Sequence, residues 1–470
     1  MGRKKNHPLL ENIEITDVGT EGKALARVDN MVVFTKNVVP GDVVDIQVNK
    51  KRKKYMEGFV TAIHKKSAVR AEPRCEHFGV CGGCKWQNLP YEEQLRYKTR
   101  HVKDSLIRIG HLDIPEVKPI MGSEDIYYYR NKMEYTFCNN RWVTAEELQE
   151  GHEIEDWRAA GFYVPGRFDK VLDLHTCHLQ AEPSNAIRNG LKKFAVKKGY
   201  SFFDLKEQTG FLRTLWVRTS STGEIMIIVV FNENRKNEIA EVMEYLKNTF
   251  PEITSLTYCI NSKGNPVISD LDIKTYSGKD HIMETMENLQ FKISPKSFYQ
   301  TNSKQAYTLY SVTREYAELT GNETVYDLYT GTGTIANFVA ANAKKVIGVE
   351  YVEDAIIDAK QNSELNGITN TSFFAGDMKD ILNDEFIASH GQPDVIITDP
   401  PRAGMHPDVV QTIMNSKPKR IVYVSCNPTT QARDLEMISD MYNVIKVQPV
   451  DMFPHTAHVE NVVQLELINP

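Results

Sequence analysis

Hydrophobic and polar positions alternate differently along three stretches of the 470-residue chain. From about residue 8 to 67, short apolar runs separated by glycine and Pro-Gly turns predict a small β-barrel of the oligonucleotide-binding type. From 68 to 288, a helical pattern near 90–109 lies among strand-like runs, which indicates an α+β domain. From 289 to 470, apolar strands alternate with helical patterns, which predicts a Rossmann-like α/β domain.

The α/β stretch opens with a strand at 325–329, a Thr-Gly-Thr-Gly-Thr turn and a helical pattern at 335–341. Such a glycine turn lets the backbone approach a nucleotide closely. The next strand ends in Glu350, 19 residues after Gly331, where a carboxylate can accept hydrogen bonds from ribose hydroxyls. Because a third glycine is absent, we expect an adenosyl group without a pyrophosphate cradle. S-adenosylmethionine is favoured, and a dehydrogenase that uses NAD is the alternative.

Two further apolar strands end in candidate chemistry, one at Asp399 (DVIITDPPR) and one at Cys426 (IVYVSCN). Open α/β sheets bind ligands at the carboxyl ends of their strands, so a cysteine at this place is a candidate nucleophile. The alternative is that Cys426 is a small buried residue, as most free cysteines are.

A cysteine motif, C-x5-C-G-G-C, places Cys75, Cys81 and Cys84 close together, and its two glycines allow the chain to curl around one group. A fourth thiolate would complete the site. Cys177 is the best candidate, and Cys138 and Cys259, which lie in apolar strand-like runs, are rivals. Four thiolates suit zinc or an iron–sulfur cluster, and the five-residue gap favours the cluster. Three unrelated cysteines are the plain alternative.

Two stretches carry signs of RNA binding. Five basic residues in a row at 50–54, expected in a loop of the barrel, can contact phosphates, or they can be merely solvated. The segment 127–137 (YYYRNKMEYTF) mixes aromatic and basic residues that can stack on bases, although an amphipathic strand would show the same pattern.

Composition narrows the setting. The chain has 56 basic and 62 acidic residues, so its net charge of −6 does not by itself indicate a nucleic acid partner. No run of 18 apolar residues is present, and the basic stretch 1–7 lacks the apolar region of a signal peptide. We therefore expect a cytoplasmic protein without a membrane span. Seven cysteines argue against a disulfide framework and for metal or catalytic use.

Four motifs in this order resemble one enzyme family: SPKSFYQTN at 294–302, DPPR at 399–402, SCNP at 425–428 and HVE at 458–460. Together with the cysteine motif and a first module that resembles a TRAM domain, they are similar to the iron–sulfur-containing RNA (uracil-5-)-methyltransferases. The resemblance covers nearly the whole chain and is closest to the enzymes that make 5-methyluridine in 23S rRNA. Relatives of these enzymes act on tRNA.

The resemblance implies roles for individual residues. Cys426 would be the nucleophile that adds to uracil C6, and Glu460 the base that removes the C5 proton. The residues that would line the S-adenosylmethionine site are Gln300, Tyr329, Glu350, Asp377 and Asp399. The residues that would hold a [4Fe–4S] cluster are Cys75, Cys81, Cys84 and Cys177.

Two positions depart from the family pattern. Thr330 stands where relatives often carry cysteine, and 142–157 looks like an insertion that could reshape the RNA surface. Two alternatives to an rRNA methyltransferase are weighed: a tRNA (uracil-5-)-methyltransferase, and a redox-sensing iron–sulfur RNA-binding protein with a vestigial catalytic domain. The second would have lost part of its catalytic set, yet that set is complete. RNA is the expected partner of a monomer that needs no obligate protein partner.

Overall fold

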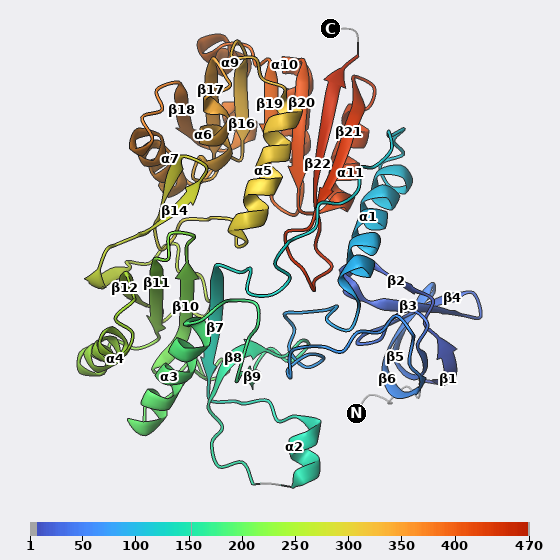
Figure 1. Ribbon diagram of the computed structural model, residues 1–470, viewed down its shortest axis with the longest axis vertical. Helices are drawn as coiled ribbons and strands as arrows, with labels where there is room; N and C mark the ends of the chain where they lie inside the picture. The colour runs from blue at the N-terminus through green and yellow to red at the C-terminus, as the bar shows by residue number, and fades with distance from the viewer. Residues whose placement is uncertain (1–6, 152, 469–470) are drawn as a thin grey trace.

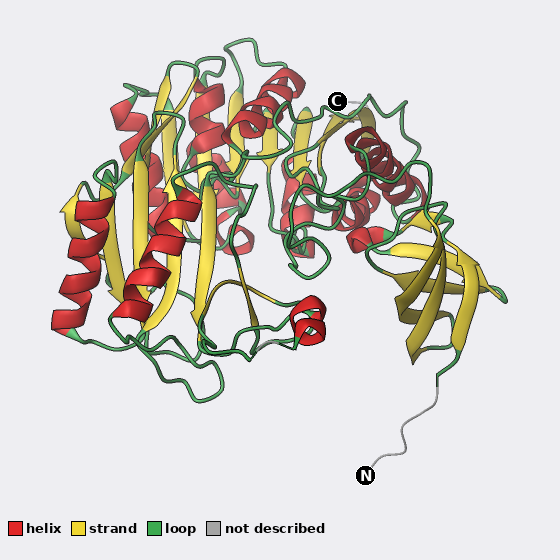
Figure 2. Ribbon diagram, turned by 60° about the horizontal axis from the view of Figure 1, so that its bottom comes forward, coloured by secondary structure: helices red, strands yellow, loops and turns green. Residues whose placement is uncertain are grey.

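The computed structural model describes residues 7–151 and 153–468 and contains three large β-sheets (Figure 1). Most of the basic N-terminal stretch, residues 1–6, lies outside the described residues, as does one residue of the predicted insertion. Figure 2 shows the first sheet at one end of the molecule, clear of the other two. None of the helices in the described part of the chain has the length and apolar character that a membrane crossing requires.

The first sheet has six strands in the order β1-β5-β6-β4-β3-β2 around a small core that includes Ala26, Val33 and Ile46. Its elements are β1 (Leu9–Glu14), β2 (Asp17–Val18), η1 (Thr20–Gly22), β3 (Ala24–Val28), β4 (Met31–Thr35), β5 (Val43–Lys51) and β6 (Tyr55–Lys65). The basic run was expected wholly in a loop, and this is wrong for its first two residues. Lys50 and Lys51 end strand β5, because they continue its pairing with β6.

The second sheet has seven strands in the order β13-β12-β11-β10-β7-β8-β9. Its strands are β7 (Lys132–Cys138), β8 (Ala159–Tyr163), β9 (Val171–Asp173), β10 (Leu212–Thr219), β11 (Ile225–Phe231), β12 (Ser255–Ile260) and β13 (Lys274–Gly278). Helices α3 (Ser184–Lys197) and α4 (Lys236–Thr249) pack on one face, and α2 (Ala145–Glu150) lies within the predicted insertion. All seven residues of β11 are buried, because the other face of this strand joins the core of the third sheet.

The third sheet has the order β18-β17-β16-β19-β20-β22-β21, in which the first five strands are parallel and β22 is antiparallel to both its neighbours. Its strands are β16 (Thr324–Leu328), β17 (Lys345–Glu350), β18 (Thr371–Ala375), β19 (Val395–Thr398), β20 (Arg420–Ser425), β21 (Tyr442–Val450) and β22 (Glu460–Leu467). Its helices are α5 (Ser303–Ala317), α6 (Thr334–Ala340), α7 (Glu353–Leu365), α8 (Met378–Ile381), α9 (Asp384–His390), α10 (Pro407–Ser416) and α11 (Pro428–Ile438).

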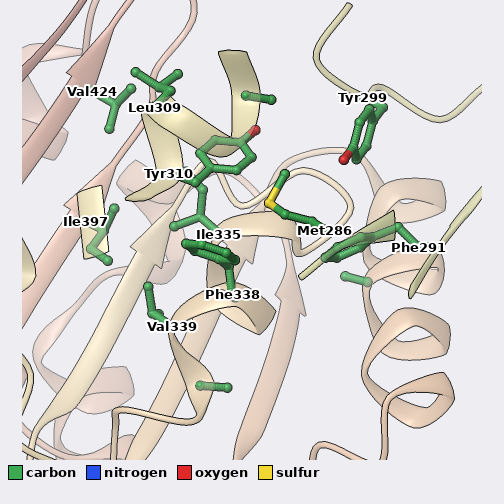
Figure 3. Close-up of a cluster of buried hydrophobic side chains, with 14 of the residues drawn as sticks. Met286, Phe291, Tyr299, Leu309, Tyr310, Ile335, Phe338, Val339, Ile397 and Val424 are labelled. Atoms are coloured by element: carbon green, nitrogen blue, oxygen red, sulfur yellow. The ribbon is translucent and has the colours of Figure 1, made fainter. Parts of the chain in front are cut away.

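Both faces of this sheet are covered, as the near-continuous apolar strands require. Helices α5, α6 and α7 share one core with the strands, and α8, α10 and α11 share the other. Figure 3 shows Tyr310 and Phe338 in the first core, together with Phe291 from the hairpin of β14 (Ile282–Met286) and β15 (Leu289–Ile293). The hairpin therefore extends the hydrophobic core beyond the third sheet.

Helix α1 (Tyr91–Arg108) confirms the helical pattern predicted near 90–109. The helix lies inside the segment 68–288, but Val102 and Leu106 belong to the core of the third sheet, beside Leu435 of α11 (Figure 1). A fully buried ion pair fixes it there: Lys98 Nζ lies 2.6 Å from Asp451 Oδ1. Tyr91 donates a hydrogen bond of 2.8 Å to the same carboxylate.

Because neither charge of this pair reaches solvent, removing one should leave the other buried and unpaired. Asp451→Asn should lower the free energy of unfolding by about 3–5 kcal/mol, measured by urea denaturation. Asp125→Asn removes the exposed pair with Lys304 and should cost at most about 1 kcal/mol. Equal losses in the two variants would contradict the role assigned to the buried pair.

Candidate active site

The carboxyl ends of five parallel strands meet at one edge of the third sheet. The strand order reverses between β16 and β19, which is where open α/β sheets form their ligand crevice. Leu328 pairs with Thr398, so Tyr329 and Asp399 follow side by side, and the Asp399 N–H donates to Leu328 O at 3.3 Å. The structure thus brings together two residues predicted for the cofactor site.

The glycine turn adopts the close-approach conformation expected for it. Gly331 and Gly333 have φ angles of 55° and 74°, which side chains rarely tolerate. A Cβ on Gly333 would lie 2.9 Å from Ala359, so helix α6 can pack here only with glycine. The Glu350 carboxylate accepts hydrogen bonds from the N–H groups of Gly331 (3.2 Å) and Val352 (3.0 Å). The predicted ribose acceptor is therefore held rigidly beside the turn.

The remaining predicted cofactor residues border this edge. Asp377 follows β18 and caps helix α8, accepting a hydrogen bond of 3.3 Å from the Lys379 N–H. Gln300 precedes helix α5, and its side chain interacts with the buried Tyr310 hydroxyl. Burial and then the Asp399 charge raise the pKa of Tyr310, so this phenol stays protonated.

Cys426 and Glu460 are neighbours across two strands. Ser425 pairs with Asn461 in the β20–β22 ladder, so the next positions on the antiparallel strands are Cys426 and Glu460. Cys426 is half-buried and lies just before α11, whose first turn is capped by Asn427 through a 3.1 Å hydrogen bond from the Thr429 N–H. A thiolate there gains from the positive end of the helix dipole.

Burial controls the charges of this pair. Glu460 is 4% exposed, and burial, with the charge of Asp399 second, raises the pKa of its carboxyl to about 8. Burial, followed by the charges of Glu460 and Asp399, raises the pKa of Cys426 to about 11. Arg402 acts against both shifts, because its positive charge favours the thiolate and the carboxylate. The same guanidinium lies 3.4 Å from the His458 ring.

Asp327 is a site residue that the sequence interpretation missed. It is fully buried in β16, and its Oδ2 accepts a 2.5 Å hydrogen bond from Thr330, the position predicted to depart from the family pattern. Burial raises the pKa of the carboxyl to about 7, although hydrogen bonds from Thr330 and from the Ala336 N–H oppose this shift. A carboxylate inside the apolar run 325–329 was the available signal, because an ionisable group there needs a reason. Burial, and then the charge of Asp327, also raises the pKa of Asp399 to about 7.

The four predicted cluster cysteines line a single cavity, together with His77, Phe162 and Leu174. Gly82 allows the loop to close, because a Cβ there would lie 2.7 Å from Pro165. The Gly83 N–H donates to Cys81 Sγ at 3.5 Å. Burial raises the pKa of Cys81 to about 11 and that of Cys84 to about 12, and nearby thiols add to both shifts.

The two rival cysteines lie elsewhere. Cys138 packs against Ala159 and Val171, and Cys259 belongs to the core that joins the second and third sheets. Within the described residues, the group whose ligand atoms all lie within 4.8 Å of one another is Glu76, His77 and His175, beside the cavity. Among the described residues, no three of the four thiols have sulfur atoms that all lie within 4.8 Å of one another.

The predicted RNA-binding segments differ in their surroundings. Lys50 is paired with Glu57 at 3.2 Å, which occupies part of the basic run. Only the part of 127–137 from Lys132 onward forms a strand, β7, and Arg130 precedes it. Both of these basic residues line a groove that reaches Thr301 and Thr456 near the sheet edge.

Comparisons with known proteins agree with this geometry. Residues 208–468 match the family described as tRNA (Uracil-5-)-methyltransferase, and residues 11–61 match the TRAM domain. An uncharacterized RNA methyltransferase of Bacteroides thetaiotaomicron is 57% identical over 96% of this chain and 100% of its own length. A similar protein of Porphyromonas gingivalis is 54% identical over 96% of this chain and 99% of its own.

The crystal structure of a Pyrococcus abyssi tRNA (uracil-54, C5)-methyltransferase with S-adenosyl-L-homocysteine is also similar. It is 28% identical, with a TM-score of 0.75 over 97% of this chain and 99% of that one. The chain therefore belongs to the tRNA (uracil-5-)-methyltransferase family and is an S-adenosylmethionine-dependent RNA methyltransferase with an N-terminal TRAM domain.

Proposed function

We propose that this protein methylates uridine C5 in RNA, with 23S rRNA as its substrate, and that Cys426 and Glu460 carry the covalent steps. The observation that supports these roles is the strand register that sets Cys426 beside Glu460, next to the cofactor edge. We retain the division into 8–67, 68–288 and 289–470 as TRAM-like, cluster and RNA-binding, and methyltransferase parts. In this proposal the protein works as a cytoplasmic monomer.

The edge of the third sheet at which the parallel strands end carries acidic groups, which suit a positively charged cofactor such as S-adenosylmethionine. The cofactor supplies a methyl group on a positively charged sulfonium. The carboxyls of Asp327 and Asp399 are both raised in pKa by burial, so a nearby cation would stabilise their ionised forms. Gln300, Tyr329, Glu350 and Asp377 surround the same edge, and we assign ribose binding to Glu350 because its carboxylate is fixed by two backbone N–H groups.

Cys426 starts the reaction because uracil C5 is a poor nucleophile. Its thiolate adds to C6, which turns C5 into an enolate-like carbon that takes the methyl group and leaves S-adenosylhomocysteine. The thiol is protonated in the free protein, since burial raises its pKa to about 11. Arg402, the amino end of α11 and the positive charge of the cofactor all favour its ionisation.

Glu460 completes the reaction by removing the proton that remains on C5. The electron pair of that C–H bond then restores the C5–C6 double bond, and the Cys426 thiolate leaves. Glu460 suits this step because its buried carboxyl group lies next to the nucleophile. For the reaction to occur, the target uridine must leave its stack and enter the pocket.

Glu460→Gln should separate these steps. Glutamine keeps the size of the side chain but cannot take the C5 proton, so a methylated protein–RNA adduct should accumulate and survive a denaturing gel. The double variant with Cys426→Ala should show no adduct. Normal turnover of Glu460→Gln would show that another residue is the base.

The pH dependence follows from the same carboxyl group. With a pKa of about 8, Glu460 is mostly protonated at pH 7 and becomes a base as the pH rises. The rate of adduct breakdown in the wild-type protein should therefore increase between pH 6 and about 9, measured by rapid quenching. A rate that falls over this range would contradict the assignment.

For the cavity of the four cysteines we propose a [4Fe–4S] cluster held by Cys75, Cys81, Cys84 and Cys177. A tetrahedral zinc ion with bonds of about 2.3 Å would need sulfur atoms about 3.8 Å apart. No three of these thiols in the described residues lie within 4.8 Å of one another, a wider spacing than zinc requires, which supports a larger group. Burial disfavours their thiolates, so a bound cationic group would stabilise the ionised ligands. The group would serve to join the cysteine loop to the second sheet.

Protein purified without oxygen should be brown and contain about four irons per chain. Cys81→Ser should lose the colour and the iron, because it removes a ligand. Cys138→Ser is the matched control, a buried thiol outside the cavity, and should keep both. Finding stoichiometric zinc and no iron would rule out the [4Fe–4S] cluster.

Two candidate functions differ in their RNA substrate, which is 23S rRNA in one and tRNA in the other. The motifs resemble the 23S rRNA enzymes most closely, whereas the similar crystal structure is that of a tRNA methyltransferase, which favours tRNA as the second candidate. Deleting the gene should remove 5-methyluridine from 23S rRNA and leave tRNA unchanged, measured by mass mapping of both RNAs. Loss from tRNA alone would establish the second candidate.

A further inference from the structure

Two loops from distant parts of the sequence meet at His455. The cysteine loop, residues 75–87, carries three of the four cavity cysteines. The 451–459 loop joins β21 to β22 and leads directly into Glu460. The N–H groups of Lys85 and Trp86, which follow Cys84, both donate to His455 O at 2.7 and 3.1 Å. Backbone hydrogen bonds therefore connect the cavity to the strand that begins with the proposed base.

The Gln94 side chain of helix α1 stabilises this contact through hydrogen bonds to both loops. Its amide is fully buried and donates to Trp86 O at 2.9 Å and Leu89 O at 2.8 Å. Its Oε1 accepts a 2.8 Å hydrogen bond from the His455 N–H. One side chain thus holds both loops, and a shift of either would leave buried polar groups without partners.

His455 has a conformation that its surroundings must impose. Its φ angle is 63°, in the left-handed region that a residue with a side chain rarely adopts. The residue is 3% exposed, and its ring packs on Tyr127 with centroids 4.4 Å apart and places Nδ1 3.2 Å from Gln94 Nε2. Such backbone strain persists only while the contacts around it hold.

The far end of the 451–459 loop borders the active site. Thr456 lines the groove that also contains Arg130 and Thr301. His458 lies 3.4 Å from Arg402, the residue whose charge acts on both Cys426 and Glu460. A displacement of this loop would change the entrance through which a uridine reaches Cys426.

We propose that the cysteine loop sets the position of the 451–459 loop through His455 and Gln94, so that the four-cysteine site shapes the entrance to the active site. The functional half of this inference rests on the proposed function. Gln94 and His455 are positioning residues, and neither takes part in the chemistry. Loss of the group held by the cysteines should loosen a loop that it does not touch.

Hydrogen exchange measured by mass spectrometry tests the link without any substrate. In Cys84→Ser and in Gln94→Ala, peptides covering 451–459 should exchange at least about tenfold faster than in the wild type, while strands β16 and β17 stay protected. The matched controls are Cys138→Ser and Gln448→Ala. Gln448 is likewise buried and donates to two carbonyls, those of Pro119 (2.8 Å) and Pro449 (3.0 Å), away from the cysteine loop.

Unchanged exchange of the loop in Cys84→Ser, or an equal increase in the controls, would overturn the proposal. If Cys84→Ser loses protection in β16 and β17 as well, Gln94→Ala, which keeps all four thiols, carries the comparison. On RNA, Gln94→Ala should lower kcat about tenfold to a hundredfold at full metal content, whereas Gln448→Ala should not. A wild-type protein inactive on uridine would refute the proposed function, and the exchange data would still decide the link.

Discussion

Three carboxyl groups at one edge of the third sheet, two of them buried and that of Asp399 half-buried, impose the main physical constraint on this molecule. Burial raises the pKa of Asp327, Asp399 and Glu460 to about 7, 7 and 8. The charge of Asp327 adds to the shift at Asp399, and the charge of Asp399 adds to that at Glu460. The free protein therefore holds an edge that favours protons or a cation. A sulfonium cofactor is such a cation, and within the protein the positive charge of Arg402 also favours the ionised form of Glu460.

The fold is what makes this edge possible. Parallel strands deliver Tyr329, Glu350 and Asp399 to one side of the sheet, and the antiparallel strand β22 delivers Glu460 from the opposite direction. Cys426 follows β20, the strand between β19 and β22, and lies just before the amino end of α11. Neighbouring side chains can then carry out methyl transfer and proton removal, because β20 ends where the antiparallel strand β22 begins.

Much of this arrangement could be predicted from local sequence. The glycine turn after β16, the strand ends at Asp399 and Cys426, and the barrel at the N-terminus follow from patterns within a few residues. The gathering of Cys177 with the cysteine motif was also anticipated, because the rival cysteines lie in apolar strands.

The parts that could not be predicted depend on contacts between distant segments. The register of β22 against β20 brings Glu460 beside Cys426, and no local pattern fixes such a pairing. Helix α1 packs on α11, more than 300 positions away in the sequence, and Lys98 of α1 pairs with Asp451 in the loop after β21. No local pattern in the sequence indicates that partner. Asp327 was missed because a single acidic residue in an apolar strand was read as part of that strand.

In the proposed mechanism, Cys426 attacks uracil C6 next to a cofactor bound at the carboxyl-end edge of the third sheet. RNA that carries 5-fluorouridine tests it most directly, because fluorine replaces the C5 proton that Glu460 must remove, so the adduct cannot resolve. With S-adenosylmethionine, the wild-type protein should form a stable methylated adduct, and digestion followed by mass spectrometry should place it on Cys426. An adduct on any other of the seven cysteines, or methylation without an adduct, would contradict the account.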